Sequence, residues 1–199
     1  YHTEEDDVHA LNGVSLKLYK GETLGLVGET GAGKTTTALS IMRLLPKRVG
    51  EITSGEIYFE GRDLLKCTEA DMRAIRGAEI SMIFQDPMTS LNPVLKVGEQ
   101  IAESIRQHEP DMKKPQVEKR VEEILEMVGI PASRKNEYPH QFSGGMKQRV
   151  VIAIALALEP RLLLADEPTT ALDVTIQAQV LQMMGDLQQK LGTSTILIT

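Results

Sequence analysis

The segment GETGAGKT at residues 28–35 has the residue types and spacing needed to hold a chain of phosphates. Its glycines allow backbone N–H groups to turn inward toward phosphate oxygens. Lys34 can bridge the β- and γ-phosphates, and Thr35 can offer its hydroxyl to Mg²⁺. The loop lies between a predicted strand and a predicted helix, which favours a phosphate-binding P-loop over a plain glycine-rich turn. The expected nucleotide contacts here are Gly28, Gly31, Gly33, Lys34, Thr35 and Thr36.

A second group of chemically capable residues follows the apolar run LLLA at residues 162–165. This run predicts a buried strand, which would bring Asp166 to the edge of the sheet where ligands collect. Asp166 is the candidate Mg²⁺ ligand, and Glu167 is the candidate base that polarises an attacking water. An acidic turn in solvent is the plainer interpretation of the same two residues. The P-loop upstream favours the catalytic one.

Composition narrows the class of protein that could carry these groups. Of 199 residues, 25% are charged and 41% hydrophobic, which is typical of a globular chain. The net charge of −6 argues against nucleic acid as a partner. The longest apolar run, at residues 150–158, is too short to cross a bilayer. Cys67 is the single cysteine, so no disulfide or cysteine metal cluster is expected.

Strand and helix patterns alternate around the glycine loop, which predicts an α/β fold with a parallel sheet at its core. A short apolar run predicts a strand just before the loop, and residues 8–18 alternate weakly and predict further β structure. Thr68 and Asp71 have the spacing of a capping box for a short helix. The expected strands cover residues 8–18, 24–27, 55–60, 80–84 and 161–166, and the expected helices cover residues 36–45, 68–75, 98–108, 116–128 and 175–191.

Residues 87–141, between the predicted strand at 80–84 and the FSGGM segment, differ in pattern from the rest of the chain. Residues 87–141 begin with a proline-containing loop and continue as amphipathic helices, which predicts a mostly helical insertion. In residues 116–128 the apolar side chains fall on one helix face. A further helix, apolar on all sides, follows Gly145, and Gly192 lies where a helix C-cap belongs.

The segment FSGGM at residues 142–146 identifies the kind of nucleotide machine. A serine and two glycines at a helix start, followed by the strand that ends in Asp166 and Glu167, resemble the signature of the ATP-binding cassette (ABC) ATPases. The commonest form, LSGGQ, differs at Phe142 and Met146 only. In that family two copies pair head to tail, and each signature closes on the ATP of the other copy. The resemblance implies this role for Ser143, Gly144 and Gly145.

Other roles follow from the same resemblance. Gln85, at the end of a predicted strand, would contact Mg²⁺ or the attacking water and act as the hinge of the helical lobe. Asp173 would lie across the dimer interface, near the P-loop of the partner. Tyr1 would stack on adenine, although an ordinary strand residue is an equal alternative.

The resemblance also defines domains and partners. It implies one ABC ATPase domain over residues 1–199, with a P-loop core and N-terminal β subdomain at 1–86 and 142–199, and a helical subdomain at 87–141. The segments IFQDPMTSLNPVLKVGEQI and DEPTTALDVTIQAQVL are similar to the ATPase subunits of bacterial dipeptide, oligopeptide and nickel importers. ATP and Mg²⁺ would be the cofactors. The expected partners are a second ATPase subunit, membrane permease subunits at the cytoplasmic face and, indirectly, a solute-binding protein.

Two alternatives remain at this point. A cassette ATPase of DNA repair or translation would be expected to carry a coiled-coil insertion or a second cassette, and a simple P-loop kinase would have no use for the signature. The chain starts without Met and stops within a predicted strand, so we expect a piece of a longer protein. The family histidine that follows this strand is not in the sequence, which predicts weak ATPase activity for this piece by itself.

Overall fold

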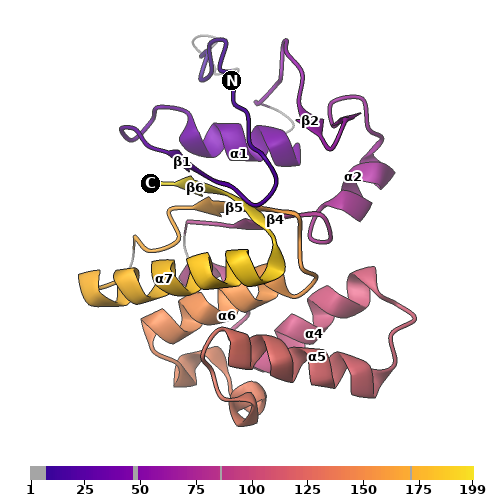
Figure 1. Ribbon diagram of the computed structural model, residues 1–199, viewed down its shortest axis with the longest axis vertical. Helices are drawn as coiled ribbons and strands as arrows, with labels where there is room; N and C mark the ends of the chain where they lie inside the picture. The colour runs from indigo at the N-terminus through magenta and orange to yellow at the C-terminus, as the bar shows by residue number, and fades with distance from the viewer. Residues whose placement is uncertain (1–7, 47–48, 86, 171) are drawn as a thin grey trace.

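The core of the protein is a parallel sheet of four strands with the order β1-β6-β5-β4 (Figure 1). The computed structural model describes residues 8–46, 49–85, 87–170 and 172–199. The strands are β1 (Thr23–Leu26), β4 (Ile80–Ile83), β5 (Leu162–Asp166) and β6 (Ser194–Ile198). Every pairing is parallel, so all four strands end at the same edge. The α/β fold with a parallel core is therefore confirmed.

Helices cover both faces of this sheet, and the alternation of side chains along β5 shows how (Figure 1). Leu162 and Leu164 belong to an apolar cluster with α1 (Lys34–Met42). Leu163 and Ala165 belong to the opposite cluster with α6 (Gly144–Leu156) and α7 (Val174–Leu191). A strand that alternates between two helical layers has no polar face, which explains why all of β5 is buried.

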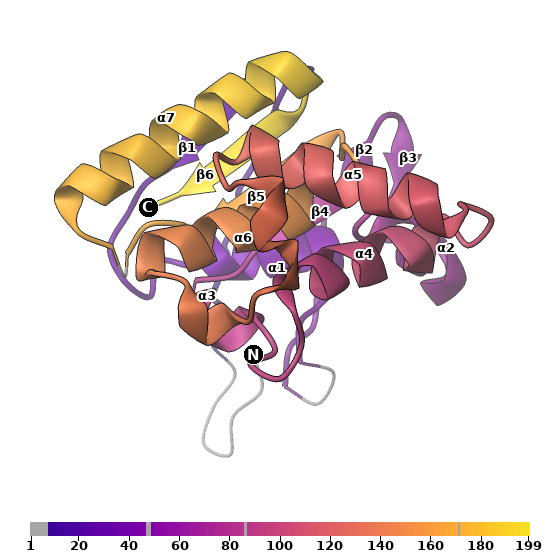
Figure 2. The same cartoon turned by 90° about the horizontal axis from the view of Figure 1, so that it is seen from below.

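Between β4 and α6 the described chain is helical, as the sequence indicates. α4 (Val97–His108) and α5 (Lys114–Met127) lie beyond α6 on its far side from the sheet (Figures 1 and 2). The apolar face predicted for α5 is buried, and it includes Val117, Val121 and Ile124. Three short elements complete the segment: α3 (Pro87–Ser90) and the 3₁₀ turns η1 (Ala132–Asn136) and η2 (Pro139–Gln141).

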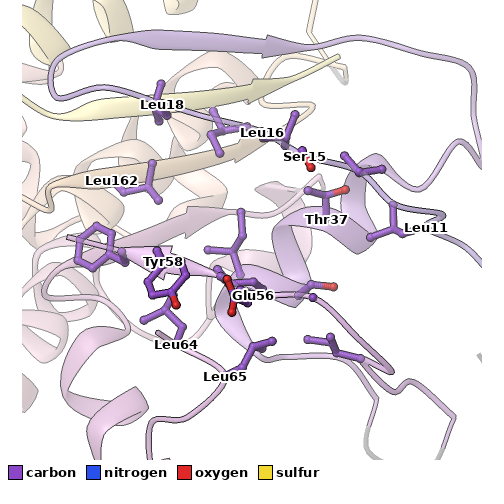
Figure 3. Close-up of a pocket in the computed structure, with 18 of the residues that line it drawn as sticks. Leu11, Ser15, Leu16, Leu18, Thr37, Glu56, Tyr58, Leu64, Leu65 and Leu162 are labelled. Carbon is purple, nitrogen blue, oxygen red and sulfur yellow. The ribbon is translucent and has the colours of Figure 1, made fainter. Parts of the chain in front are cut away.

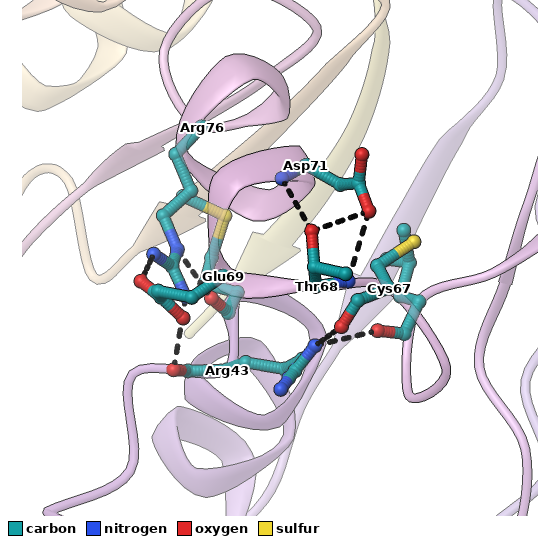
Figure 4. Close-up of polar contacts among 8 residues, drawn as sticks. Arg43, Cys67, Thr68, Glu69, Asp71 and Arg76 are labelled. Carbon is teal, nitrogen blue, oxygen red and sulfur yellow. Dashed lines mark hydrogen bonds and ion pairs between the residues drawn. The ribbon is translucent and has the colours of Figure 1, made fainter.

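A network of arginines ties α2 (Glu69–Ile75) to the carboxyl end of α1 (Figure 4). Arg76 donates from Nε to the Met42 carbonyl at 2.8 Å and from Nη2 to the Arg43 carbonyl at 3.2 Å. These bonds satisfy carbonyls that a helix end leaves unpaired. The predicted capping box is present, since Thr68 accepts from the Asp71 N–H and Asp71 accepts from the Thr68 N–H. The network fixes α1 at the end opposite its phosphate loop.

The β structure expected for residues 8–18 is wrong, because the described residues there contain no strand. Apolar side chains in this stretch, including Val14 and Leu16, are exposed beside an open pocket of about 1270 Å³ (Figure 3).

The strand expected at residues 55–60 is shorter than predicted: β2 (Tyr58–Phe59) pairs antiparallel with β3 (Arg62–Asp63). Without a longer neighbour to complete its hydrogen bonds, an alternating sequence does not form an extended strand.

The remaining elements agree with the sequence to within a few residues. α1 begins two residues earlier than expected, at Lys34, and Gly192 caps α7 with φ of 67°. Among the described residues, no helix combines the length and apolar character needed to cross a membrane.

Replacement of Gly98 by alanine tests the packing of the helical segment. The added Cβ would lie 2.8 Å from the Lys135 carbonyl oxygen, so α4 and η1 would have to separate. We expect Gly98→Ala to lower the free energy of unfolding by about 1–3 kcal/mol in urea titrations. Gly185→Ala is the matched control, because its Cβ meets nothing within 4 Å, and it should raise stability by about 0.5–1 kcal/mol. Equal effects at the two glycines would contradict this packing.

Candidate functional site

The glycine loop after β1 has the form that phosphate binding requires. Gly33 has φ of 83° and is the N-cap of α1, with no side chain bonded to the helix start. A Cβ at Gly33 would lie 2.6 Å from the Ala10 carbonyl oxygen, so only glycine fits. The start of α1 therefore presents backbone N–H groups and the positive end of its dipole at the loop.

The ammonium group of Lys34 folds back over the same loop. Its Nζ donates to the carbonyl oxygens of Gly28 at 2.6 Å and Glu29 at 2.9 Å. These bonds hold the charge above the loop, where it can exchange one carbonyl for a phosphate oxygen of a nucleotide. Gly31, which also has a positive φ, lies in the turn between Glu29 and Lys34. Thr36 follows in the first turn of α1.

Asp166 ends β5 and is only 2% exposed. The pKa of its carboxyl is raised above the ordinary value of 3.8, mainly because burial disfavours the charged form. A hydrogen bond with Thr35 lowers this pKa, and the charge of Glu167 raises it. Its Oδ1 has no hydrogen-bond partner among the described residues. A buried carboxylate oxygen without a partner is costly unless a cation compensates it. The structure thus brings together two residues, Thr35 and Asp166, that are far apart in the sequence.

Glu167 and Gln85 meet at the same edge of the sheet. The Gln85 Nε2 donates to Glu167 Oε2 at 2.8 Å, and the Thr170 hydroxyl donates to the same oxygen at 3.0 Å. Glu167 has φ of 45°, a left-handed conformation that turns it away from the direction of Asp166. Its N–H bonds the Ile198 carbonyl at 3.0 Å, which anchors this turn to β6. The two acids thus have different surroundings and can perform different tasks.

These residues fit a magnesium ion. The described residues contain no group of three or more His, Cys, Asp or Glu side chains placed to hold a metal. Mg²⁺ does not require such a group, since it commonly takes one or two protein oxygens together with waters and substrate phosphates. Asp166 with its unpartnered oxygen and the Thr35 hydroxyl beside it are donors of this kind.

Ser143, Gly144 and Gly145 form the start of α6. Ser143 is the N-cap, and its Oγ accepts from the Met146 N–H at 3.3 Å. Gly145 packs closely on α7, because a Cβ there would lie 2.6 Å from Cγ2 of Ile176. Ser143 and Gly144 are exposed. The structure therefore provides a second helix start, open to solvent, that can receive an anion.

Asp173 is exposed at the N-cap position of α7, with no capping bond from its side chain. It is available to another molecule at this end of the helix. Tyr1 lies outside the described residues. The large pocket beside residues 8–18 borders this site at Thr36, but none of the other predicted nucleotide or carboxylate residues is among its described lining residues.

Sequence reasoning missed two residues, one that contacts this site and one that supports it. Thr170 bonds Glu167, and Gln177 holds the loop that carries Thr170. The spacing of three residues between Glu167 and Thr170 was a signal for a local turn contact. Nothing in the sequence pattern indicated the side chain of Gln177.

Comparison with known proteins agrees with this geometry. The profile of the ABC transporter family matches residues 11–170, so the chain belongs to the ABC transporter family. It is 57% identical to the oligopeptide transport ATP-binding protein OppD and 55% identical to the dipeptide transport ATP-binding protein DppD, both of Bacillus subtilis, over 100% and 96% of its length. The chain spans 56% and 58% of these two relatives.

The fold agrees with a solved cassette structure. The dimeric ATP-binding cassette MJ0796, in a post-hydrolysis state bound to ADP and Pi, matches with a TM-score of 0.85 and 31% identity. The match covers 100% of this chain and 83% of that one. The P-loop NTPase class and the cassette fold predicted from the sequence are confirmed.

Replacement of Asp166 tests the buried charge. In Mg²⁺-free buffer we expect Asp166→Asn to be more stable than the wild type at neutral pH, because the variant buries no charge. A raised folded pKa means that the native carboxyl gains its proton as the pH falls toward the ordinary value of 3.8. The difference in melting temperature should therefore shrink on mild acidification. A difference independent of pH would show that the charge of Asp166 is not the cause.

Proposed function

We propose that this chain is the ATP-binding and ATP-hydrolysing part of an importer for dipeptides or oligopeptides. The contact of Gln85 with Glu167, beside the Thr35–Asp166 pair and the glycine loop, carries the proposal. These contacts support Glu167 as the base and Asp166 as the metal ligand, next to a loop that would bind the phosphates. The names of OppD and DppD support short peptides as the cargo.

The residues have separate tasks in this proposal. The loop N–H groups and Lys34 hold the phosphates, while Gly28, Gly31 and Gly33 let the backbone approach them. Thr35, Asp166 and Gln85 hold Mg²⁺, which when bound neutralises charge on the β- and γ-phosphates. Glu167 polarises the attacking water. Its carboxylate lies on the same side as Gln85, so both can contact one water molecule.

A second copy completes the site. The exposed start of α6, with Ser143, Gly144 and Gly145, would face the γ-phosphate held by the partner, and Asp173 would lie near the partner's glycine loop. The exposure of Ser143 and Gly144 at the start of α6 supports this role. Tyr1 would add a stacking contact with adenine.

Transport requires that closure of the dimer be passed to the membrane. We propose that residues 87–141 form the lobe that contacts permease subunits, and that Gln85 links it to the nucleotide. The protein would then act at the cytoplasmic face of the membrane, peripherally, and receive cargo through a solute-binding protein. The net charge of −6 argues against nucleic acid as a partner.

Replacement of Lys34 tests the phosphate site. Lys34→Ala removes a charged donor to the phosphates, so Mg-ATP affinity should fall by about 10–100-fold in titration calorimetry. The melting temperature should also fall modestly at neutral pH, because the positive charge of Lys34 stabilises the buried Asp166 carboxylate. Unchanged affinity would overturn the assignment of this loop.

Replacement of Glu167 tests both the base and the dimer. In the full-length protein, Glu167→Gln should bind Mg-ATP normally, hydrolyse it at least about 100-fold more slowly, and shift from monomer to dimer when ATP is added. Light scattering with and without Mg-ATP measures the shift. Wild-type turnover would remove Glu167 as the base. ATP binding without dimerisation would leave the phosphate loop standing and overturn the proposed head-to-tail dimer.

A further inference from the structure

Gln177 lies one turn into α7 and clamps the loop that joins β5 to this helix. Its Nε2 donates to the Thr169 carbonyl at 3.0 Å and to the Leu172 carbonyl at 2.9 Å. A single amide group that bonds two carbonyls on either side of a turn fixes the shape of that turn. These two bonds therefore tie the loop to α7.

This clamped loop contacts Glu167. The Thr170 hydroxyl donates to Glu167 Oε2 at 3.0 Å, and the Thr170 N–H bonds the Glu167 carbonyl at 3.3 Å. Gln85 donates to the same Oε2 from the other side at 2.8 Å. Because two donors share one oxygen, the carboxylate is held in a single orientation.

The same loop borders the other candidate loops. Leu172 lies 3.7 Å from the position of a Cβ at Gly144, at the start of α6. Asp173, the next residue, is exposed at the start of α7. Gln177 thus fixes a segment that reaches from Glu167 to the signature and to the proposed dimer surface.

We propose that Gln177 and Thr170 are positioning residues for hydrolysis: Gln177 fixes the loop, and Thr170 aligns the Glu167 carboxylate with its water. This inference rests on the proposed role of Glu167 as the base. The geometry predicts a serial effect, in which Gln177 acts on Glu167 through Thr170. Their described hydrogen bonds go to Glu167 and to the loop after β5 and none goes to the phosphate loop, so we expect ATP binding to be independent of them.

The test uses the full-length protein, four single variants and one double variant. Thr170→Val removes the hydroxyl, and Thr170→Ser retains it. Gln177→Glu replaces the donor by a carboxylate that faces two carbonyl oxygens. Gln182→Glu is the matched control, because Gln182 lies on the same helix and bonds only Asp186, at 3.0 Å, among the contacts described here.

We expect Thr170→Val and Gln177→Glu each to lower kcat for ATP by about tenfold, with KM and Mg-ATP affinity unchanged. Thr170→Ser should restore most of kcat, and Gln182→Glu should match the wild type. The double variant Thr170→Val/Gln177→Glu should be no slower than the slower single variant, since the two act in series.

Several outcomes would overturn the inference. These are unchanged kcat in Thr170→Val, equal losses in Thr170→Ser and Thr170→Val, or losses that multiply in the double variant. Loss of Mg-ATP binding would show a structural effect instead, and circular dichroism melting checks that each variant is folded. A wild type that neither binds nor hydrolyses ATP would instead refute the proposed function, which separates the two failures.

Discussion

A buried carboxylate at the end of a buried strand governs the rest of this structure. Asp166 is 2% exposed, and one of its oxygens has no hydrogen-bond partner in the described chain. Such a group needs a hydrogen bond or an opposite charge nearby, and the Thr35 hydroxyl supplies the first and the Lys34 ammonium the second. The parallel sheet makes this possible, because β1 and β5 end at the same edge and bring the glycine loop next to the acid.

Most of the core could be predicted from the sequence because its signals are local. The glycine loop between a strand and a helix, the apolar run before Asp166 and the one-sided apolar pattern of α5 each depend on neighbouring residues only. The capping box of Thr68 and Asp71 is equally local, and it is present. The family resemblance then supplied roles that no local pattern contains, such as that of Gln85.

The features that the sequence did not predict correctly depend on contacts between distant segments. Residues 8–18 carry an alternating pattern, but strand formation depends on a partner strand that the pattern does not specify. The close packing of Gly145 on Ile176 depends on how two helices cross. The clamp from Gln177 depends on the path of a loop, and amide side chains have no periodic signal. Contacts between segments distant in the sequence are therefore the part that required the structure.

The order of strands in the sheet has a consequence for folding during synthesis. β1 leads into the phosphate loop, yet its partner in the described sheet is β6, at residues 194–198. During translation the phosphate loop leaves the ribosome before β6 has been synthesised, so β1 has no β6 to pair with while the intervening helices are made. Closing so long a separation is slow, and meanwhile the edge of β5 that β6 will cover stays open to other strands. The native edges of β1 and β5 are therefore paired only after β6 has been inserted between them.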